Sequence, residues 1–469
     1  MPTVCKKGNQ VQFEFQHAST RQVVADFQGG DITSDAGALL VRQVASHTHI
    51  LSDVASCFID HRRTELIRHS IEELVGQRIL GIACGYEDLN DHEQLRDDPL
   101  WRLLAGKANP GQEPAAGKST LNRLEVGIAR GAGSAPGRYH KIGVDEQAFT
   151  ELFTRWYIAA HQDDPPEEII LDLDATEDPL HGDQEGKFFH GYYYHYCYLP
   201  LYMFAGDHLL WAELRPSDID GSKGSEQALE QVFGQLREVW PSVRIIVRGD
   251  SGFARDGLMG WCEAHGVEYV FGLAKNNRLR DKIAPQAAVA ERLHHLSGEP
   301  ERVFAEFWYQ TRDSWSRSRR VIGKAEYLSR GANPRFVVTS LHPAQMDGQR
   351  LYEQLYCARG EAENRIKEQQ LYLFADRTSC SAMKANQLRL WFSSVAYCLL
   401  NELRRIGLKN TEWARAQCHS IREKLLKIGG LVRVSVRRIH VAFASGYPWK
   451  DIFRQVAGNI RRGWEPSYR

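Results

Sequence analysis

The order of strands and helices expected between residues 168 and 273 limits the possible folds more than any other feature of this sequence. The expected elements are strands at 169–174, 194–204 and 209–214, a helix at 225–240, a strand at 244–247, a helix at 258–265 and a strand at 269–273. Consecutive strands followed by alternating helices and strands are typical of an α/β domain built on one mixed sheet.

Three strands, a helix, a strand, a helix and a strand is the order of a ribonuclease-H-like core. Such a core ends with a further helix, which the elements up to residue 273 do not include. Residues 276–345 do not supply it, because 302–309, 319–327 and 335–341 have the composition of strands. We therefore predict a mixed-sheet core interrupted by a β-rich insertion and closed by long helices at 352–374 and 383–406.

The regions that flank the core have different sequence patterns. Apolar residues at helical spacing over 35–44 and 66–82 predict that the first 150 residues are mostly helical. Stretches rich in Gly, Pro and Ala at 106–118 and 131–137 are expected loops, and the second marks a boundary. The predicted segments are a helical N-terminal region (1–150), the first part of the core (151–275), the insertion (276–345), the closing helices (346–410) and a basic C-terminal module (411–469).

Composition excludes several classes of protein. With 43% hydrophobic and 25% charged residues in 469, the chain has the composition of a globular protein rather than a disordered one. We find no apolar run as long as the roughly 18–20 residues that a membrane span needs. The 9 cysteines are dispersed without a C-x-x-C pair, which argues against a disulfide framework and against a structural zinc site. We expect a cytoplasmic protein.

Charge is unevenly distributed along the chain. Lys and Arg number 59, and so do Asp and Glu, so the net charge is zero. Residues 401–469 nevertheless hold 15 Lys and Arg against 5 Asp and Glu. Such a basic segment on an acidic body suggests binding of a polyanion, although a solvated basic surface has the same composition.

Three aspartates occupy positions where an α/β core gathers its ligands. Asp172 and Asp174 lie on one face of the first core strand, because strand side chains alternate, and Asp250 ends the fourth strand. Adjacent strand ends bring such carboxylates together. Asp250 could alternatively cap the following helix.

The closing helix offers a third acid. Tyr356, Arg359, Glu363 and Lys367 fall within one stripe of a helix at about 100° per residue, and these residue types are poorly suited to pure packing. Three converging carboxylates repel one another, and a hard divalent cation such as Mg²⁺ or Mn²⁺ removes that repulsion. Two such ions about 3.5–4 Å apart can activate a water or a 3′-hydroxyl at a phosphodiester.

At these residues the sequence resembles the DDE transposases of bacterial insertion sequences, in the group that carries a β-strand insertion between the second Asp and the Glu. The signature of that group is Tyr-x2-Arg-x3-Glu-x6-Lys. Tyr356, Arg359 and Glu363 match its spacing, whereas the lysine position falls on Gln370. Further similar stretches are Asp174-Ala175-Thr176, Asp250-Ser251-Gly252-Phe253, Asp35-Ala36-Gly37 and Ala385-Asn386-Gln387.

The resemblance implies roles for particular residues. Asp174, Asp250 and Glu363 would hold two Mg²⁺ ions, for which Mn²⁺ can substitute, with Asp172 as the alternative first ligand. The implied DNA-binding residues are Tyr356, Arg359, Lys367 in place of the missing lysine, and either Trp308 or Trp315, which would stack on a flipped base. His181, His190 and His195 are expected to be structural.

The resemblance also implies an activity and partners. The protein would cleave DNA at the terminal inverted repeats of its element and join the 3′-hydroxyl to target DNA. It would act as a homodimer in a synaptic complex that associates with the nucleoid. The N-terminal region (1–150) and the basic C-terminal module (411–469) would be its DNA-binding parts. A ribonuclease-H-like metal nuclease without strand transfer and a catalytically inactive DNA-binding derivative are the alternatives.

Overall fold

The protein is represented by a computed structural model that describes residues 4–7, 10–107, 109–111, 113–127 and 140–464. The chain forms two compact units: unit 1 comprises 1–47, 68–121 and 403–469, and unit 2 comprises 48–67 and 122–402. The boundary expected at 131–137 lies outside the described residues. The division of the chain into five functional segments stays a prediction. Among the described helices, none has both the length and the apolar character needed to cross a bilayer.

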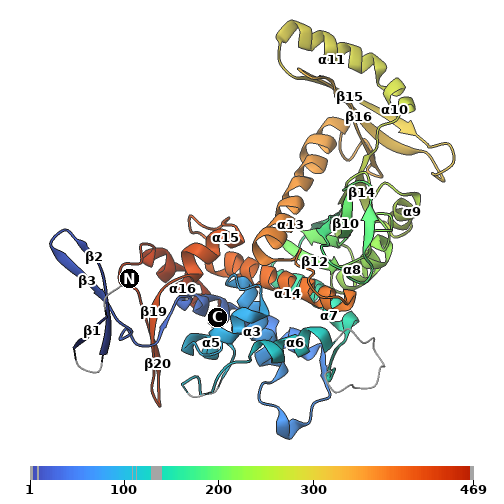
Figure 1. Cartoon of the computed structure of the whole chain (residues 1–469). Helices are drawn as coiled ribbons and strands as arrows, with labels where there is room; N and C mark the ends of the chain where they lie inside the picture. Colours follow the sequence, from blue (N-terminus) through green and yellow to red (C-terminus); the bar gives the residue numbers. More distant parts are fainter. Residues whose placement is uncertain (1–3, 8–9, 108, 112, 128–139, 465–469) are drawn as a thin grey trace. The chain divides into compact units, whose positions relative to one another are not determined.

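Unit 1 begins with an antiparallel sheet in the order β1-β2-β3 (Val4–Lys7, Gln10–Ala18 and Arg21–Ala25; Figure 1). The prediction that the first 150 residues are mostly helical is wrong for this stretch. Phe13 and Phe15 alternate with Gln12 and Glu14, and this period of two favours a strand.

Helices form most of the remainder of unit 1. They are α1 (Leu39–Thr48), α3 (Ile71–Ala83), α4 (His92–Leu95), α5 (Pro99–Leu104), α6 (Lys118–Gly127), which runs on into unit 2, α15 (Cys418–Ile421) and α16 (Lys450–Trp464). A small sheet in the order β20-β19-β4 (Ile439–Phe443, Gly430–Val434 and Ile32–Thr33) joins the two ends of the sequence.

A buried carboxylate links distant segments of unit 1. The Asp35 carboxylate accepts hydrogen bonds from Tyr86 Oη (2.8 Å) and Trp101 Nε1 (2.9 Å), and it pairs with Lys427 Nζ at 2.8 Å. Asp35 is 1% exposed, so these three donors replace the water that its charge would otherwise require. Asp35 therefore has a structural explanation within unit 1.

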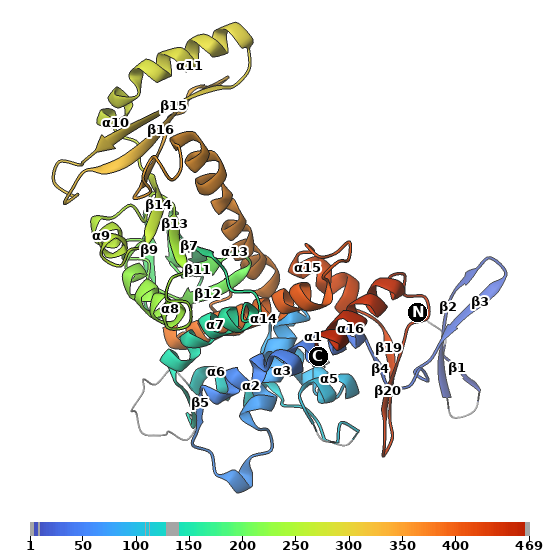
Figure 2. The same cartoon turned by 180° about the vertical axis from the view of Figure 1, so that it is seen from behind.

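The main sheet of unit 2 has the strand order β12-β11-β7-β13-β14-β18-β16-β15, with β17 pairing with β16 (Figures 1 and 2). The strands are β7 (Glu168–Ala175), β11 (Leu201–Ala205), β12 (His208–Glu213), β13 (Arg244–Gly249), β14 (Glu268–Leu273), β15 (Glu301–Tyr309), β16 (Arg319–Leu328), β17 (Gly331–Ala332) and β18 (Arg335–Thr339). β13 runs parallel to β7 and β14, whereas β11 and β18 run antiparallel to their neighbours. The sheet is mixed, as predicted; its ribonuclease-H-like character stays a prediction.

Helices cover both faces of this sheet, as Figure 2 shows for α8, α9 and α13. On one face, α8 (Ser225–Val239) and α9 (Asp256–Ala264) pack on alternating residues such as Leu171 and Val247. On the other face, a π-helical turn (Leu351–Tyr356) packs against Ile246 and Val270. That turn follows α12 (Gly348–Arg350) and leads through a 3-10 turn (Cys357–Arg359) into α13 (Gly360–Leu373).

The remaining elements of unit 2 support the sheet at one end. They are α2 (Ile50–Ser56), β5 (Phe58–Asp60) paired with β6 (Ile142–Val144), α7 (Glu146–Ala160) and α14 (Met383–Glu402). The Trp391 ring stacks on Phe149 with centroids 4.6 Å apart, and its Nε1 donates to Ala212 O. These contacts join α14 to α7 and to β12.

The single strand expected at 194–204 is divided at Pro200. β10 (His195–Tyr198) belongs to a small sheet with β8 (Asp178–Pro179) and β9 (Phe188–His190), while β11 belongs to the main sheet. Proline has no N–H for a ladder, so the strand breaks there.

The insertion differs from the prediction in two respects. It opens with helices α10 (Asn277–Lys282) and α11 (Ala284–Ser297), which were not expected. Its strands also do not form a separate sheet, because β18 pairs with β14 and with β16. The insertion therefore extends the core sheet.

A buried ion pair ties two core strands to the closing helix. Arg248 Nε and Nη2 donate to the two Asp172 oxygens at 2.5 and 2.6 Å, and Arg248 Nη1 donates to Leu355 O at 2.6 Å. Asp172 and Arg248 are 3% and 6% exposed. Every polar group of this pair faces a partner of opposite charge or dipole, which is the condition for a tolerable buried charge.

We predict that Arg248→Met lowers the free energy of unfolding by about 3–5 kcal/mol, because Asp172 would remain buried without its counter-charge. Arg244→Met is the matched control on the same strand: Arg244 pairs with Glu168 and Glu268 but its side chain is 43% exposed. Its loss should cost about 1 kcal/mol or less. Urea denaturation of both variants tests this, and equal midpoints would contradict it.

Candidate active site

Asp174 and Asp250 lie next to each other at the ends of parallel strands. β7 and β13 are parallel, and Gly249 is opposite Leu173. The next residues along the two chains, Asp250 and Asp174, therefore lie side by side. Neighbouring strands are about 4.8 Å apart, which places the two carboxylates within reach of a shared ligand. Asp250 does not cap a helix, since α9 begins at Asp256 and its N-cap is Arg255. Its Oδ1 instead accepts from the Gly252 N–H at 2.8 Å.

Glu363 reaches the same place from α13. The Arg359 guanidinium lies between the acids: Nη1 is 3.6 Å from Asp174 Oδ2, and Nη2 donates to Glu363 Oε1 at 2.5 Å. Arg359 stands just before the helix, at the end of the π-helical and 3-10 turns. Irregular helical turns of this kind are frequent at functional sites.

The electrostatics of Asp174 reflect this crowding. Burial raises its pKa from the usual value to about 7, and the charges of Asp250 and Glu363 add to the increase while Arg359 opposes it. One guanidinium among three carboxylates leaves an excess of negative charge. Oxygen ligands with uncompensated charge are what Mg²⁺ and Mn²⁺ bind, so the residues present fit such an ion.

Asp172, the alternative first ligand, is engaged elsewhere. Both of its oxygens are occupied by Arg248, and only 4% of its side chain is exposed, against 16% for Asp174. The geometry therefore favours Asp174, although the assignment of the metal ligands stays a prediction. Arg248 is a residue that sequence reasoning missed. Arg248 precedes Asp250 by two residues and therefore lies on the same face of the strand, which could have indicated that it faces an acid on the neighbouring strand.

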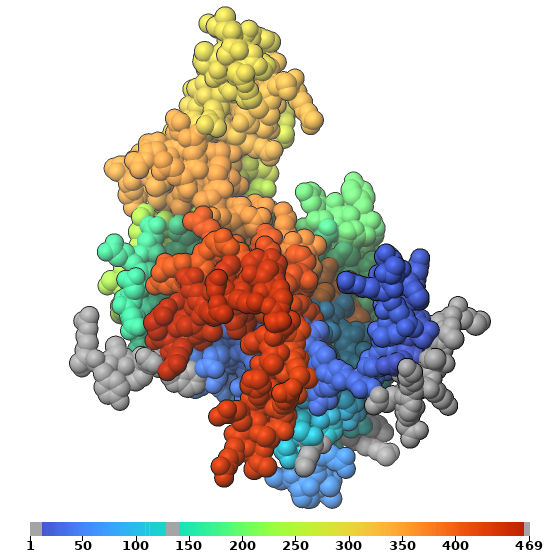
Figure 3. Space-filling model, turned by 90° about the vertical axis from the view of Figure 1, so that its left-hand side faces the viewer, coloured from blue at the N-terminus to red at the C-terminus, as the bar shows by residue number. Residues whose placement is uncertain are grey.

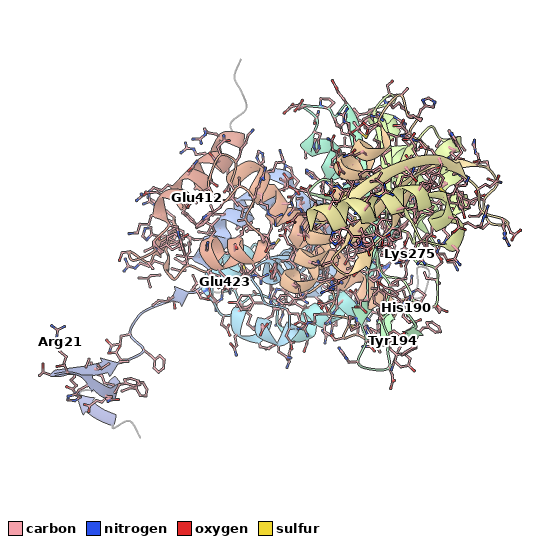
Figure 4. All side chains as sticks on the ribbon, turned by 90° about the horizontal axis from the view of Figure 1, so that it is seen from above. Arg21, His190, Tyr194, Lys275, Glu412 and Glu423 are labelled. Atoms are coloured by element: carbon pink, nitrogen blue, oxygen red, sulfur yellow. The ribbon has the colours of Figure 1, made fainter. Side chains whose placement is uncertain are left out.

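A cavity of about 520 Å³ opens beside Asp250. Its walls include Ser251, Lys275, which Figure 4 labels, Arg335 and Tyr356. The Tyr356 hydroxyl lies 2.6 Å from where a Cβ at Gly272 would stand, so only glycine admits this tyrosine. Tyr356 and Asp250 line the same cavity, burial raises the pKa of Tyr356, and its role in DNA binding stays a prediction.

The two candidates for the signature lysine differ in their surroundings. Lys367 is exposed on α13, one turn beyond Glu363. Gln370 Nε2 donates to Glu177 O (3.0 Å) and to Asp178 Oδ1 (2.9 Å). Asp178 is fully buried, and burial raises its pKa to about 8. The glutamine thus holds a neutral carboxyl in place, and its role here is structural.

The two tryptophans lie in different environments. Trp308 on β15 is 61% exposed and available for stacking. Trp315 is 6% exposed, with its ring against Tyr309 (5.8 Å between centroids) and beside the Arg319 guanidinium. Trp315 is part of the hydrophobic core, so Trp308 is the more accessible of the two, and base stacking by either ring stays a prediction.

Comparison with known proteins identifies the class. A family model described as "Transposase DDE domain group 1" matches residues 15–464. The match covers nearly the whole chain, and the chain therefore belongs to this family of DNA-processing enzymes.

Among solved structures, the chain is similar to one described as "Cryo-EM structure of piggyBac transposase synaptic complex with hairpin DNA (SNHP)". The identity is 11%, the match covers 93% of this chain and 83% of that chain, and the TM-score is 0.38. No curated protein matches the sequence.

We predict that Asp178→Asn flattens the pH dependence of stability. A pKa raised to about 8 means that the folded protein holds a proton which the unfolded chain releases above about pH 4. The contribution of this group to stability therefore falls as the pH rises from about 4 to 8. Asn keeps the side-chain shape without titrating. Thermal midpoints from pH 5 to 9 would run parallel in the two proteins if this explanation were wrong.

Proposed function

We propose that this protein is a transposase that cleaves DNA at the terminal inverted repeats of an insertion sequence and joins the freed end to target DNA. The observation that carries the proposal is that Asp174 and Glu363 share one arginine while Asp250 lies at the neighbouring strand end, in a chain of the DDE transposase family. The two neighbouring strand ends and the closing helix supply these acids from sites 76 and 113 residues apart in the sequence.

Asp174, Asp250 and Glu363 would hold two Mg²⁺ ions. When bound, such ions lower the pKa of a water or 3′-hydroxyl and stabilise the oxygen that leaves phosphorus. In the first step water attacks the phosphodiester and frees a 3′-hydroxyl. In the second, that hydroxyl attacks a target phosphodiester, one P–O bond forms as another breaks, and the proton is lost to solvent.

Arg359 and Tyr356 are placed to meet the DNA backbone. Arg359 now neutralises Asp174 and Glu363; once cations take over that task, its guanidinium is available to clamp a phosphate with two hydrogen bonds. Tyr356 lines the cavity beside Asp250. Lys367 and Trp308 are exposed and would contact the strand further out.

Unit 1 carries basic side chains that suit binding to phosphates. Arg433, Arg437 and Arg438 are exposed on and after β19, and α16 is a strongly amphipathic helix with Arg461 and Arg462 in its last turn. Contacts of this kind would position the transposon end without reading its sequence. Joining two ends requires both to be held at once, so we propose a homodimer on DNA.

We predict that Asp250→Asn and Glu363→Gln each reduce cleavage and joining by more than about a hundredfold, because even supporting groups around a metal site are typically worth 10–100-fold. Binding of the DNA end should persist. The matched control is Glu361→Gln, an exposed acid in the first turn of the same helix, which should retain activity. The assay incubates purified protein, terminal-repeat DNA and Mg²⁺ and separates cleaved from joined products.

The products distinguish the alternatives. Cleavage without a joined product would favour a metal nuclease, and end binding without either product would indicate an inactive DNA-binding derivative. Full activity of Asp250→Asn would remove that residue from the site and overturn the mechanism.

A further inference from the structure

The small sheet β8-β10-β9 brings together three side chains that bind metals. Glu177 immediately precedes β8, and His195 and Cys197 both belong to β10. One ligand atom from each, including Cys197 Sγ, lies within 4.8 Å of the other two. The sequence separates Glu177 from the other two, so the spacing of the cysteines alone did not reveal the cluster.

The sheet holds these ligands rigidly. β10 is the central strand, with Cys197 opposite Pro179 on one side and Phe188 on the other. His195 and Cys197 are two residues apart and therefore point to the same face. The backbone carbonyl of Glu177 accepts a hydrogen bond from the Gln370 side chain, which holds the backbone of Glu177 in place. Backbone pairing thus holds His195 and Cys197, while the hydrogen bond from Gln370 holds the backbone of Glu177, which lies between β7 and β8.

Glu177 and His195 are in direct contact within this cluster. Glu177 Oε2 is 2.6 Å from His195 Nε2, the distance of an ion pair, and both atoms are shielded from water. The contact holds a carboxylate oxygen and a ring nitrogen close to Cys197 Sγ, so a cation at this point would have three ligand atoms within reach.

We propose that Glu177, His195 and Cys197 bind a zinc ion. A thiolate, an imidazole and a carboxylate are zinc ligands, whereas Mg²⁺ takes oxygen ligands. With a carboxylate, a thiolate and a neutral imidazole, the site would be electrically neutral once zinc is bound. Ligands of tetrahedral zinc are about 3.3–3.7 Å apart, so Glu177 and His195 would separate by about 1 Å.

The site allows both that movement and the entry of the ion. The side chains of His195 and Glu177 are 39% and 32% exposed, so they can rotate, and water can take the fourth position. The hairpin lies at the surface: Tyr192 and Tyr194 at its turn are 79% and 80% exposed, and Figure 4 labels Tyr194 and His190 there. Figure 3 shows this segment as a green projection.

The ion would fix the segment that follows the first candidate magnesium ligand. Glu177 is three residues after Asp174, so zinc would anchor the end of β7 to β10. This role is independent of the proposed function and is structural: the zinc would not contact the DNA phosphates or the three acids.

Cobalt substitution tests the site directly. The full-length protein is freed of metal with a chelator, titrated with Co²⁺, and examined for the near-ultraviolet charge-transfer band that a cobalt–thiolate bond produces. We expect the band to saturate at one Co²⁺ per chain and to disappear when Zn²⁺ is added. Cys197→Ser should lack the band, and His195→Gln should weaken metal binding at least about tenfold.

Two controls separate this site from the rest of the protein. Cys380→Ser removes a half-buried cysteine outside the cluster and should leave the band intact. Asp250→Asn should also leave it intact, because the catalytic acids provide no sulfur; its effect on DNA cleavage reports on the proposed function alone. Absence of the band in the wild-type protein, or its persistence in Cys197→Ser, would overturn the zinc site.

Discussion

The bidentate pair between Asp172 and Arg248 is the interaction on which the rest of unit 2 depends. It joins β7 to β13 in the register that brings Asp174 beside Asp250, and the third donor of the same guanidinium holds Leu355. Tyr356, Arg359 and Glu363 follow Leu355 within nine residues. One buried charge pair therefore bridges the two strands and the start of the closing helix, and either charge would be costly to leave buried without its partner.

Charge balance governs the neighbouring acids in a different way. Asp172 has a permanent partner, whereas Asp174 shares Arg359 with Glu363 at 3.6 and 2.5 Å. The pKa of Asp174 is raised to about 7 mainly because burial disfavours its charge. A residue pair that is fully satisfied stabilises the fold, while an acid that is only partly compensated can exchange its partner for a cation. The strand thus carries, two residues apart, a carboxylate that is fully paired and one that we propose binds a cation.

Gln370 shows how one departure from a family signature is accommodated. A lysine there would bring a positive charge next to Asp178, which is fully buried and has a pKa of about 8. Glutamine instead donates to a neutral carboxyl and to the Glu177 carbonyl. The cost of burying a charged pair is avoided. Lys367, exposed one turn beyond Glu363, retains a positive charge on the same helix.

The sequence by itself determined the order of the strands of the main sheet and of the helices from residue 168 to 273, but not the small sheet β8-β10-β9. It also determined the alternation that places Asp172 and Asp174 on one face, and the stripe from Tyr356 to Lys367. These features have periods of two or 3.6 residues, so a short stretch of sequence is enough to predict them. Two features were not predicted: helix α11 (Ala284–Ser297) within the insertion, and the N-terminal strands β1, β2 and β3. Short-range patterns predict structure less well where no long amphipathic element forms. Only the tertiary structure decided that Arg248 forms an ion pair with Asp172 and that Trp315 is buried in the core. It also decided that Glu177 lies close to His195 and Cys197. Those outcomes depend on strand register and on packing between distant segments, which no local period encodes.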